Sequence, residues 1–146
     1  LASRLIGLEH PDVLAAGAFY LTSPESARVI EETRDSALGG MGHACELETS
    51  IYLHIDPDAV EMDKAVDENS FPEGPNAWMD WSDGPLKLMP WWNALSHTGV
   101  HGDATKATAE KGKVLLEQAV RECVGFVTEL RDKPLPVRWE PSERVP

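Results

Sequence analysis

Cysteine is scarce in this chain of 146 residues, which contains only Cys45 and Cys123. The two lie far apart and form neither a CxxC pair nor the spacing of a zinc finger. We therefore expect reduced thiols in a cytoplasmic protein, because that compartment keeps cysteines unpaired. A single disulfide between the two is the alternative.

Basic residues and long apolar runs are also in short supply. The chain has 13 lysines and arginines against 25 acidic residues, which gives a formal net charge of −12 and a pI of about 4.7. This acidity argues against nucleic acid or an anionic membrane surface as the main partner. No run of about 18 apolar residues exists to span a membrane, and the N-terminus lacks the basic start and apolar core of a signal peptide.

Several common site signatures are missing as well, namely GxGxxG, the P-loop, GxSxG and HExxH. The chain has instead a concentrated stretch at residues 40–50 that holds glycines, His43, Glu46 and Glu48. Glycine lets a backbone approach a ligand closely, histidine can move a proton or bind a metal, and carboxylates bind hard cations. The alternative is a glycine turn before an exposed acidic helix start, with His43 as a cap.

Two helices are indicated by local signals. Ser23 followed by Pro24 predicts a helix over 24–36. A second helix, the longest, is predicted over 105–131 by a broad apolar stripe that should pack on a sheet or in a core. Gly112 within it costs about 1 kcal/mol relative to alanine, so we expect a close contact there. The stripe comprises Ala109, Leu116, Ala119, Val120, Cys123, Val124, Val127 and Leu130.

Other segments give weaker signals. Residues 17–21 are expected to form a strand, whereas helical and strand periodicities compete over 48–54. Residues 66–99 contain prolines and glycines that prevent long regular elements, namely Pro72, Gly74, Pro75, Gly84, Pro85 and Pro90. The segment is nevertheless rich in aromatic residues, and we therefore expect it to be ordered. Its tryptophans are candidates for a substrate lid, with an oligomer contact or a simple cover over the core as alternatives. They are Trp78, Trp81, Trp91 and Trp92.

Two stretches together resemble a known family. Residues 43–50 read His-Ala-Cys-Glu-Leu-Glu-Thr-Ser, and residues 98–105 read Thr-Gly-Val-His-Gly-Asp-Ala-Thr, followed by Ala-Thr-Ala-Glu-Lys-Gly at 107–112. They are similar to the His-Ala/Gly-Gly-x-x-Glu-Thr-Ser and Gly-Val-x-Gly-Asp-Pro-Thr segments of the creatininase (creatinine amidohydrolase) family. The resemblance covers about 37–131. This chain has Cys45 where the family has glycine and Ala104 where the family has proline. It also has Gly39 at the position where creatininase has a tryptophan, which makes creatinine a doubtful substrate.

The resemblance implies a three-layer αβα fold with a mainly parallel sheet. This chain resembles only the C-terminal part of it, with residues 1–132 inside the domain and 133–146 as an extended tail. It also implies homo-oligomers, often hexamers, and two divalent ions per site, which are zinc, manganese or iron. The family's early Glu-x-His and Asn/Asp-Gly-His ligand segments are absent here, so the N-terminal half of the same protein, or a second chain, is expected to supply them.

The chemistry that the resemblance implies is hydrolysis of a cyclic amide or related small ring compound. Two metal ions activate a bridging water that attacks the carbonyl carbon, a metal stabilises the oxyanion, and His43 donates a proton to the leaving nitrogen. Glu48 is the first candidate for a metal ligand and Glu46 the second. A structural cap is the alternative for Glu48, and the structural interpretation is favoured for His101. Other hypotheses are a non-catalytic subunit or scaffold of the same fold and a small-ring binding module.

Overall fold

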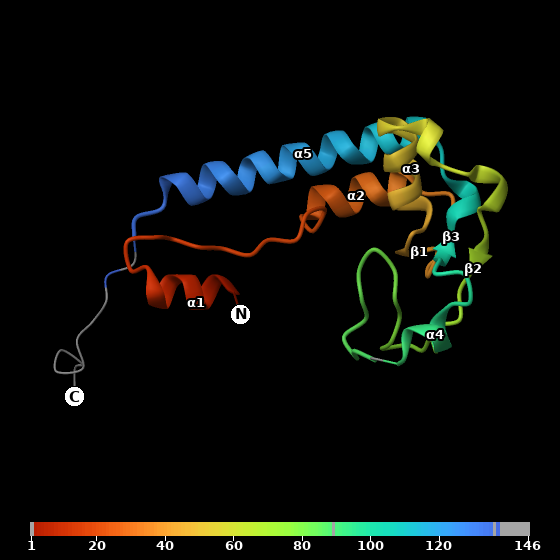
Figure 1. Ribbon diagram of the computed structural model, residues 1–146, viewed down its shortest axis with the longest axis horizontal. Helices are drawn as coiled ribbons and strands as arrows, with labels where there is room; N and C mark the ends of the chain where they lie inside the picture. The colour runs from red at the N-terminus through yellow and green to blue at the C-terminus, as the bar shows by residue number, and fades with distance from the viewer. Residues whose placement is uncertain (1, 89, 136, 138–146) are drawn as a thin grey trace.

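The computed structural model describes residues 2–88, 90–135 and 137. In Figure 1 the long helix α5 runs along one side, α2 lies beneath it, and α3 meets its first turns near a small sheet. In chain order the elements are α1 (Ala2–Glu9), α2 (Pro24–Thr33), β1 (Met41–His43), α3 (Glu46–Ile55), η1 (Pro57–Ala59), η2 (Met62–Lys64), β2 (Asp67–Glu68), α4 (Trp92–Leu95), β3 (His101–Asp103), η3 (Ala104–Lys106) and α5 (Ala109–Asp132).

The sheet has three short strands in the order β1-β3-β2, and both pairings are antiparallel. Met41 lies opposite Gly102, and His43 lies opposite His101. Gly102 has a φ of +127°, and a Cβ at this position would stand 2.4 Å from the carbonyl oxygen of Gly40. The α/β class is confirmed, whereas the parallel strand order expected for the family's main sheet does not occur among the described strands.

The core lies where α2, α3 and α5 meet. Its largest fully buried apolar side chains are Ile30, Met41 and Leu115. The predicted start of the helix at 24–36 is confirmed in α2, with the Ser23 hydroxyl accepting a hydrogen bond from the Ser26 N–H at 3.1 Å, but the helix ends at Thr33, earlier than predicted. For residues 48–54 the helix prevails, and the first turns of α3, with Glu46, Leu47 and Ser50 buried, pack against α5.

Two predictions about element boundaries are wrong. Residues 17–21 form no strand in the described structure, where an extended arm leads into α2 instead. The long helix begins at Ala109 rather than Thr105. Asp103 caps the short turn η3 by accepting from the Thr105 N–H, and Thr108 then caps α5.

The apolar stripe of α5 is largely exposed, contrary to expectation. Val120, Cys123, Val124 and Val127 face outward and line an open groove of about 440 Å³. The buried side of α5 is rotated from the stripe and carries Gly112, Leu115, Gln118, Ala119 and Glu122. The predicted core position of Cys123 is therefore wrong. Both cysteines are free thiols, which rules out the disulfide alternative in this fold.

The C-terminal end of α5 falls at Asp132. Most of the predicted tail, 133–146, lies outside the described residues, and the proposed division of the chain at 132 stays a prediction. No helix within the described ranges has both the length and the apolar character needed to cross a membrane.

Candidate functional site

The segment from β1 into α3 is a strand, a sharp turn and a helix start. His43 ends β1, Ala44 takes a φ of +49°, and Cys45 is the N-cap of α3. A positive φ is unusual for a residue with a Cβ and is kept only where the surroundings enforce it. Here the pairing of β1 with β3 and the buried thiol of Cys45 hold the turn from both sides. His43 itself is exposed at the end of the strand.

Glu48 reaches back to the N-cap of its own helix. Its Oε2 accepts from the Cys45 backbone N–H at 3.1 Å and from the Cys45 thiol at 2.8 Å. Burial, together with the charge of Glu48, raises the pKa of the Cys45 thiol, so the thiol remains a protonated donor. The capping alternative for Glu48 is therefore realised. Its side chain remains exposed, and a role as metal ligand stays a prediction.

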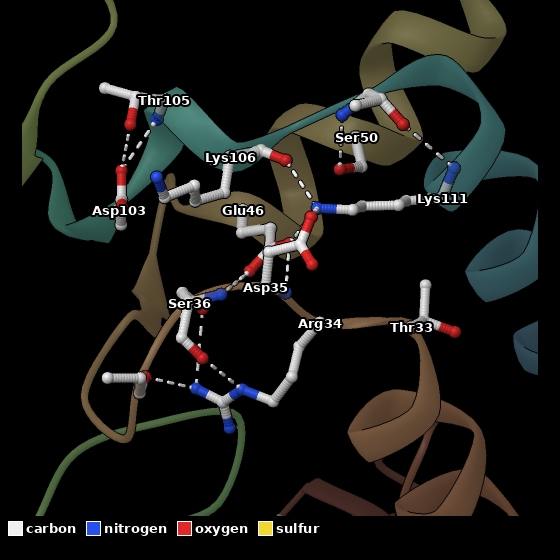
Figure 2. Close-up of polar contacts among 12 residues, drawn as sticks. Thr33, Arg34, Asp35, Ser36, Glu46, Ser50, Asp103, Thr105, Lys106 and Lys111 are labelled. Carbon is white, nitrogen blue, oxygen red and sulfur yellow. Dashed lines mark hydrogen bonds and ion pairs between the residues drawn. The ribbon is translucent and has the colours of Figure 1, made fainter.

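Glu46 is fully buried, and both of its carboxylate oxygens accept hydrogen bonds from other groups of the protein. Oε1 accepts from the Asp35 N–H at 2.9 Å and from Lys111 Nζ at 2.5 Å, and Oε2 accepts from the Ser36 N–H at 2.8 Å (Figure 2). Burial opposes the charge, but the hydrogen bonds from Lys111, Ser36 and Asp35 outweigh it and lower the pKa of Glu46. This arrangement joins α3 to α5 and to the end of α2, and it favours a structural role for Glu46.

The two sequence motifs meet in space. The Thr108 N–H donates to the Ser50 hydroxyl at 3.1 Å, and the backbone of Gly112 lies against the carbonyl of Ser50. Lys111, between them, donates to Glu46 and to the Lys106 carbonyl (Figure 2). The second motif, at residues 98–112, thus packs against and supports the first turns of α3. The sequence did not predict this structural role.

The four candidate tryptophans do not share one site. The Trp92 ring packs edge-on against the His43 imidazole, with centroids 4.9 Å apart and planes inclined by 64°. Trp81 lines a cavity of about 480 Å³ together with Tyr20 and Glu48. Trp78 lines a separate cavity of about 110 Å³, and Trp91 is 85% exposed. The structure therefore brings together His43 with Trp92, and Glu48 with Trp81.

Two carboxylates, buried Asp80 and half-exposed Glu68, anchor the long loop that carries these tryptophans. Asp80 pairs with Arg34 at 2.7 Å and accepts from the Met41 N–H at 2.8 Å, which fixes the loop beside β1. Glu68 accepts from the Ser96 hydroxyl at 3.1 Å and from the His97 N–H at 2.6 Å. The His97 N–H and the Thr98 hydroxyl hold the pKa of Glu68 at about 2. Single acidic residues in a loop gave no sequence signal for these contacts.

His101 is fully buried in β3, opposite His43. Neither ring nitrogen has a well-formed hydrogen bond within the described residues. Desolvation lowers the pKa of His101, while Glu73, the Met79 backbone and the charges of Asp80 and Glu68 act weakly in the opposite direction. The ring is held by packing, with its Cδ2 against Gly42 and the Phe71 ring 6.0 Å away in a T-shaped arrangement. This agrees with the structural role expected for it.

A family-type metal centre requires several convergent ligands. The described part of the chain contains no group of three histidine, cysteine or acidic side chains that could hold a metal ion. Glu46 is taken by protein donors, and Oε2 of Glu48 is taken by Cys45. These residues do not by themselves fit a two-metal site.

Solved structures define the class of this fold. A Bacteroides fragilis protein provisionally named a creatinine amidohydrolase superposes with a TM-score of 0.68 at 26% identity, over 92% of this chain and 50% of that one. A glutamate-to-glutamine mutant of creatininase in a Zn–Zn form and creatininase in a Mn form superpose over 88% of this chain, with TM-scores of 0.57 and 0.56 at 21% and 22% identity. The class is that of creatininase-like α/β proteins.

The sequence comparisons give the family. The creatinine amidohydrolase family model matches residues 1–127, and the chain therefore belongs to the creatininase family. Curated relatives are mycofactocin precursor peptide peptidases, 32% identical over 109 residues in Mycobacterium ulcerans and over 105 residues in Mycolicibacterium smegmatis. The alignments cover 71% and 68% of this chain. The chain spans about a third of the length of these relatives, 35% and 34%.

Proposed function

We propose that this chain is the C-terminal part of a metal-dependent hydrolase that cleaves a C–N bond in a cyclic amide or a related small compound. The observation that carries the proposal is the strand–turn–helix at 41–55. It lies within residues 1–127, which match the family model. It leaves the imidazole of His43 and the carboxylate of Glu48 exposed, while Glu46 is held in the interior.

In this proposal His43 moves the proton. Its backbone is fixed by pairing with β3, and its exposed ring can reach a leaving nitrogen as a general acid. Glu48 contributes negative charge to the cavity of about 480 Å³, which is large enough for a small ring compound. Trp81 lines this cavity and can contact the substrate there, whereas Trp92 packs against the ring of His43.

The metal dependence rests on the family. Zinc and manganese belong to the creatininase structures that share this fold, and two divalent ions would supply an activated water. Because the described residues form no metal site, we propose that the N-terminal half of the same protein, or a second chain, supplies the ligands. The exposed apolar stripe of α5 supports this, since a half-domain would leave such a face open. Homo-oligomerisation and a cytoplasmic location stay predictions.

A linear peptide is the second candidate substrate. The curated relatives at 32% identity are peptidases, and Gly39 occupies the position at which creatininase has a tryptophan. A peptide amide and a cyclic amide present the same scissile C–N bond, so the same proton donor serves either. A non-catalytic scaffold of the same fold is the alternative from another class.

Elemental analysis of the complete native protein, beside its intact mass, tests the proposal first. About two transition-metal ions per complete protomer, with extra mass or a partner chain present, support the hydrolase. A metal-free protein of 16.0 kDa contradicts it and favours the scaffold. Substitution His43→Ala follows, screened on cyclic amides and on short peptides. A hydrolase loses turnover with its metals retained, whereas a binding module keeps its affinity.

A further inference from the structure

The indole of Trp92 is the aromatic group that contacts the candidate proton donor. The two rings meet edge to face, with centroids 4.9 Å apart, an arrangement that aromatic pairs favour. The neighbouring Trp91 is the N-cap of α4 and points into solvent with 85% of its surface exposed. Adjacent tryptophans in one loop are therefore in different environments, and only Trp92 of this pair contacts His43.

Trp92 is held in place by the same sheet that holds His43. Leu95, one turn after Trp92 in α4, is buried with 4% exposed. The residues that follow α4 are captured by Glu68, which accepts from the Ser96 hydroxyl and the His97 N–H. Glu68 belongs to β2, β2 pairs with β3, and β3 pairs with β1 at His43. The contact between Trp92 and His43 thus completes a continuous series of contacts that runs from β1 through β3, β2 and Glu68 to α4.

We propose that Trp92 is a positioning residue for His43. The inference rests on the proposed function of His43 as proton donor. Pairing with His101 fixes the backbone of His43 but leaves its exposed side chain free to rotate about χ1 and χ2. The indole ring, inclined by 64° to the imidazole at a centroid distance of 4.9 Å, limits that rotation and covers one side of the imidazole. The ring is thereby presented to the substrate in one orientation, which is the condition for efficient proton transfer.

Chemical modification of the complete protein tests the orientation without a known substrate. Diethyl pyrocarbonate is the probe, and mass spectrometry follows carbethoxylation at each histidine separately. We expect Trp92→Ala to speed modification of His43 on the order of threefold, because the ring regains its three staggered χ1 wells. Trp92→Phe should restore the original rate, since it keeps an aromatic edge. Exposed His97 serves as the internal reference, and Trp91→Ala as the matched control.

The result that overturns the proposal is an unchanged His43 rate in Trp92→Ala, or the same acceleration in Trp91→Ala. If Trp92→Ala does not fold, the pair Trp92→Phe and Trp92→Leu decides. Leucine keeps apolar bulk without the aromatic edge, so a faster rate in the leucine variant alone supports positioning, and equal rates contradict it.

Kinetics on the amide identified by the screen separate this inference from the proposed function. Trp92→Ala should lower kcat about tenfold or more, with KM little changed. Full activity in His43→Ala would refute the proposed function, whatever Trp92 does. Loss of activity in His43→Ala with normal kcat in Trp92→Ala would refute positioning alone. A rise in KM without a fall in kcat would also refute it, because it would identify Trp92 as a substrate contact.

Discussion

Gly112 of α5 and the carbonyl of Ser50 in α3 are in direct contact. A Cβ at Gly112 would stand 1.8 Å from the Ser50 oxygen, closer than any real packing allows. Substitution Gly112→Ala should therefore push α5 away from α3, even though alanine is the better helix former by about 1 kcal/mol. We expect a net loss of about 2 kcal/mol or more, as for other overpacked sites. Urea denaturation measures it.

The same helix provides a matched control. Gly125 also lies within α5, but among the described residues no atom beyond its chain neighbours and the backbone of its own helix lies within 4 Å of the position of a Cβ there. Gly125→Ala should raise the free energy of unfolding by about 0.5–1 kcal/mol through helix propensity. Equal effects at both glycines would show that the contact with Ser50 is not what excludes a side chain at 112.

Local signals were enough to predict part of this fold. The Ser23–Pro24 helix start and a glycine at 112 inside a helical pattern can be recognised from a few consecutive residues, and the helix start and a close contact at Gly112 were both predicted correctly. The motif at 43–50 led to the family because its residue types and spacing are specific. The exposure of Val124 and Cys123 could not be predicted in this way. An apolar stripe indicates that a partner surface is required, but it does not tell whether the same chain supplies that surface.

The polar framework was beyond sequence reasoning because its partners are remote. Glu46 meets Lys111, and Glu122 meets Ser23 across most of the chain. A lone glutamate in a helix is usually solvated, so nothing in the local pattern marks either as buried. The contact between Trp92 and His43 likewise depends on how Glu68 holds the loop. Only tertiary structure distinguishes Trp92 from Trp91.

Glu122 should be critical for the start of α2. Its carboxylate accepts from the N–H groups of Thr22 and Ser23 at 3.0 and 2.7 Å and from the Ser26 hydroxyl at 2.7 Å. Glu122→Gln places an amide donor against these donors and should cost about 2 kcal/mol in free energy of unfolding. Exposed Glu117→Gln, in the same helix, should change it by less than about 0.5 kcal/mol. Similar losses in both variants would contradict the assignment.

The same residue predicts sensitivity to acid. Burial opposes its charge, but the hydrogen bonds from Ser26, Ser23 and Thr22 lower the pKa of Glu122 below its ordinary value of 4.5. A carboxyl with a depressed native pKa stabilises the fold above its unfolded value, and this contribution is lost as the pH falls through the native pKa. The free energy of unfolding, measured as a function of pH below 4.5, should therefore fall less steeply with falling pH in Glu122→Gln than in the unaltered protein.

The Glu46–Lys111 pair should show strong coupling. Glu46 is fully buried and the Lys111 side chain is 13% exposed, so Lys111→Met leaves a buried carboxylate without its counter-charge. The expected loss is about 3 kcal/mol. Adding Glu46→Gln should recover part of it, because the uncompensated charge is removed. Denaturation of both single variants and the double variant gives the coupling energy. Lys113→Met, at an exposed position two residues further along α5, is the control. Additive effects of the Lys111 and Glu46 substitutions would contradict a coupling between these two residues.

His101 should make the protein less stable as the pH falls below neutrality. Burial lowers its native pKa below the ordinary 6.5, so the unfolded chain takes up a proton before the native protein does. Stability is therefore complete above about pH 6.5 and declines as the pH falls from there toward the lower native pKa. Glu73, Asp80 and Glu68 oppose this shift but do not reverse it. The decline is specific to a buried imidazole.

Substitution His101→Leu tests that origin. It removes a buried polar ring whose nitrogens have no well-formed hydrogen bonds to any residue that the structure describes, so the free energy of unfolding at about pH 7.5 should change by only about 1 kcal/mol. The decline below pH 6.5 should then flatten, because the titrating group is gone. His97→Gln replaces an exposed imidazole and should leave the decline as it is. His101 lies opposite His43 in the β1–β3 pair. If stability still declines below about pH 6.5 in His101→Leu, another group causes the decline, and the packing of His101 in β3 does not explain the dependence of stability on pH.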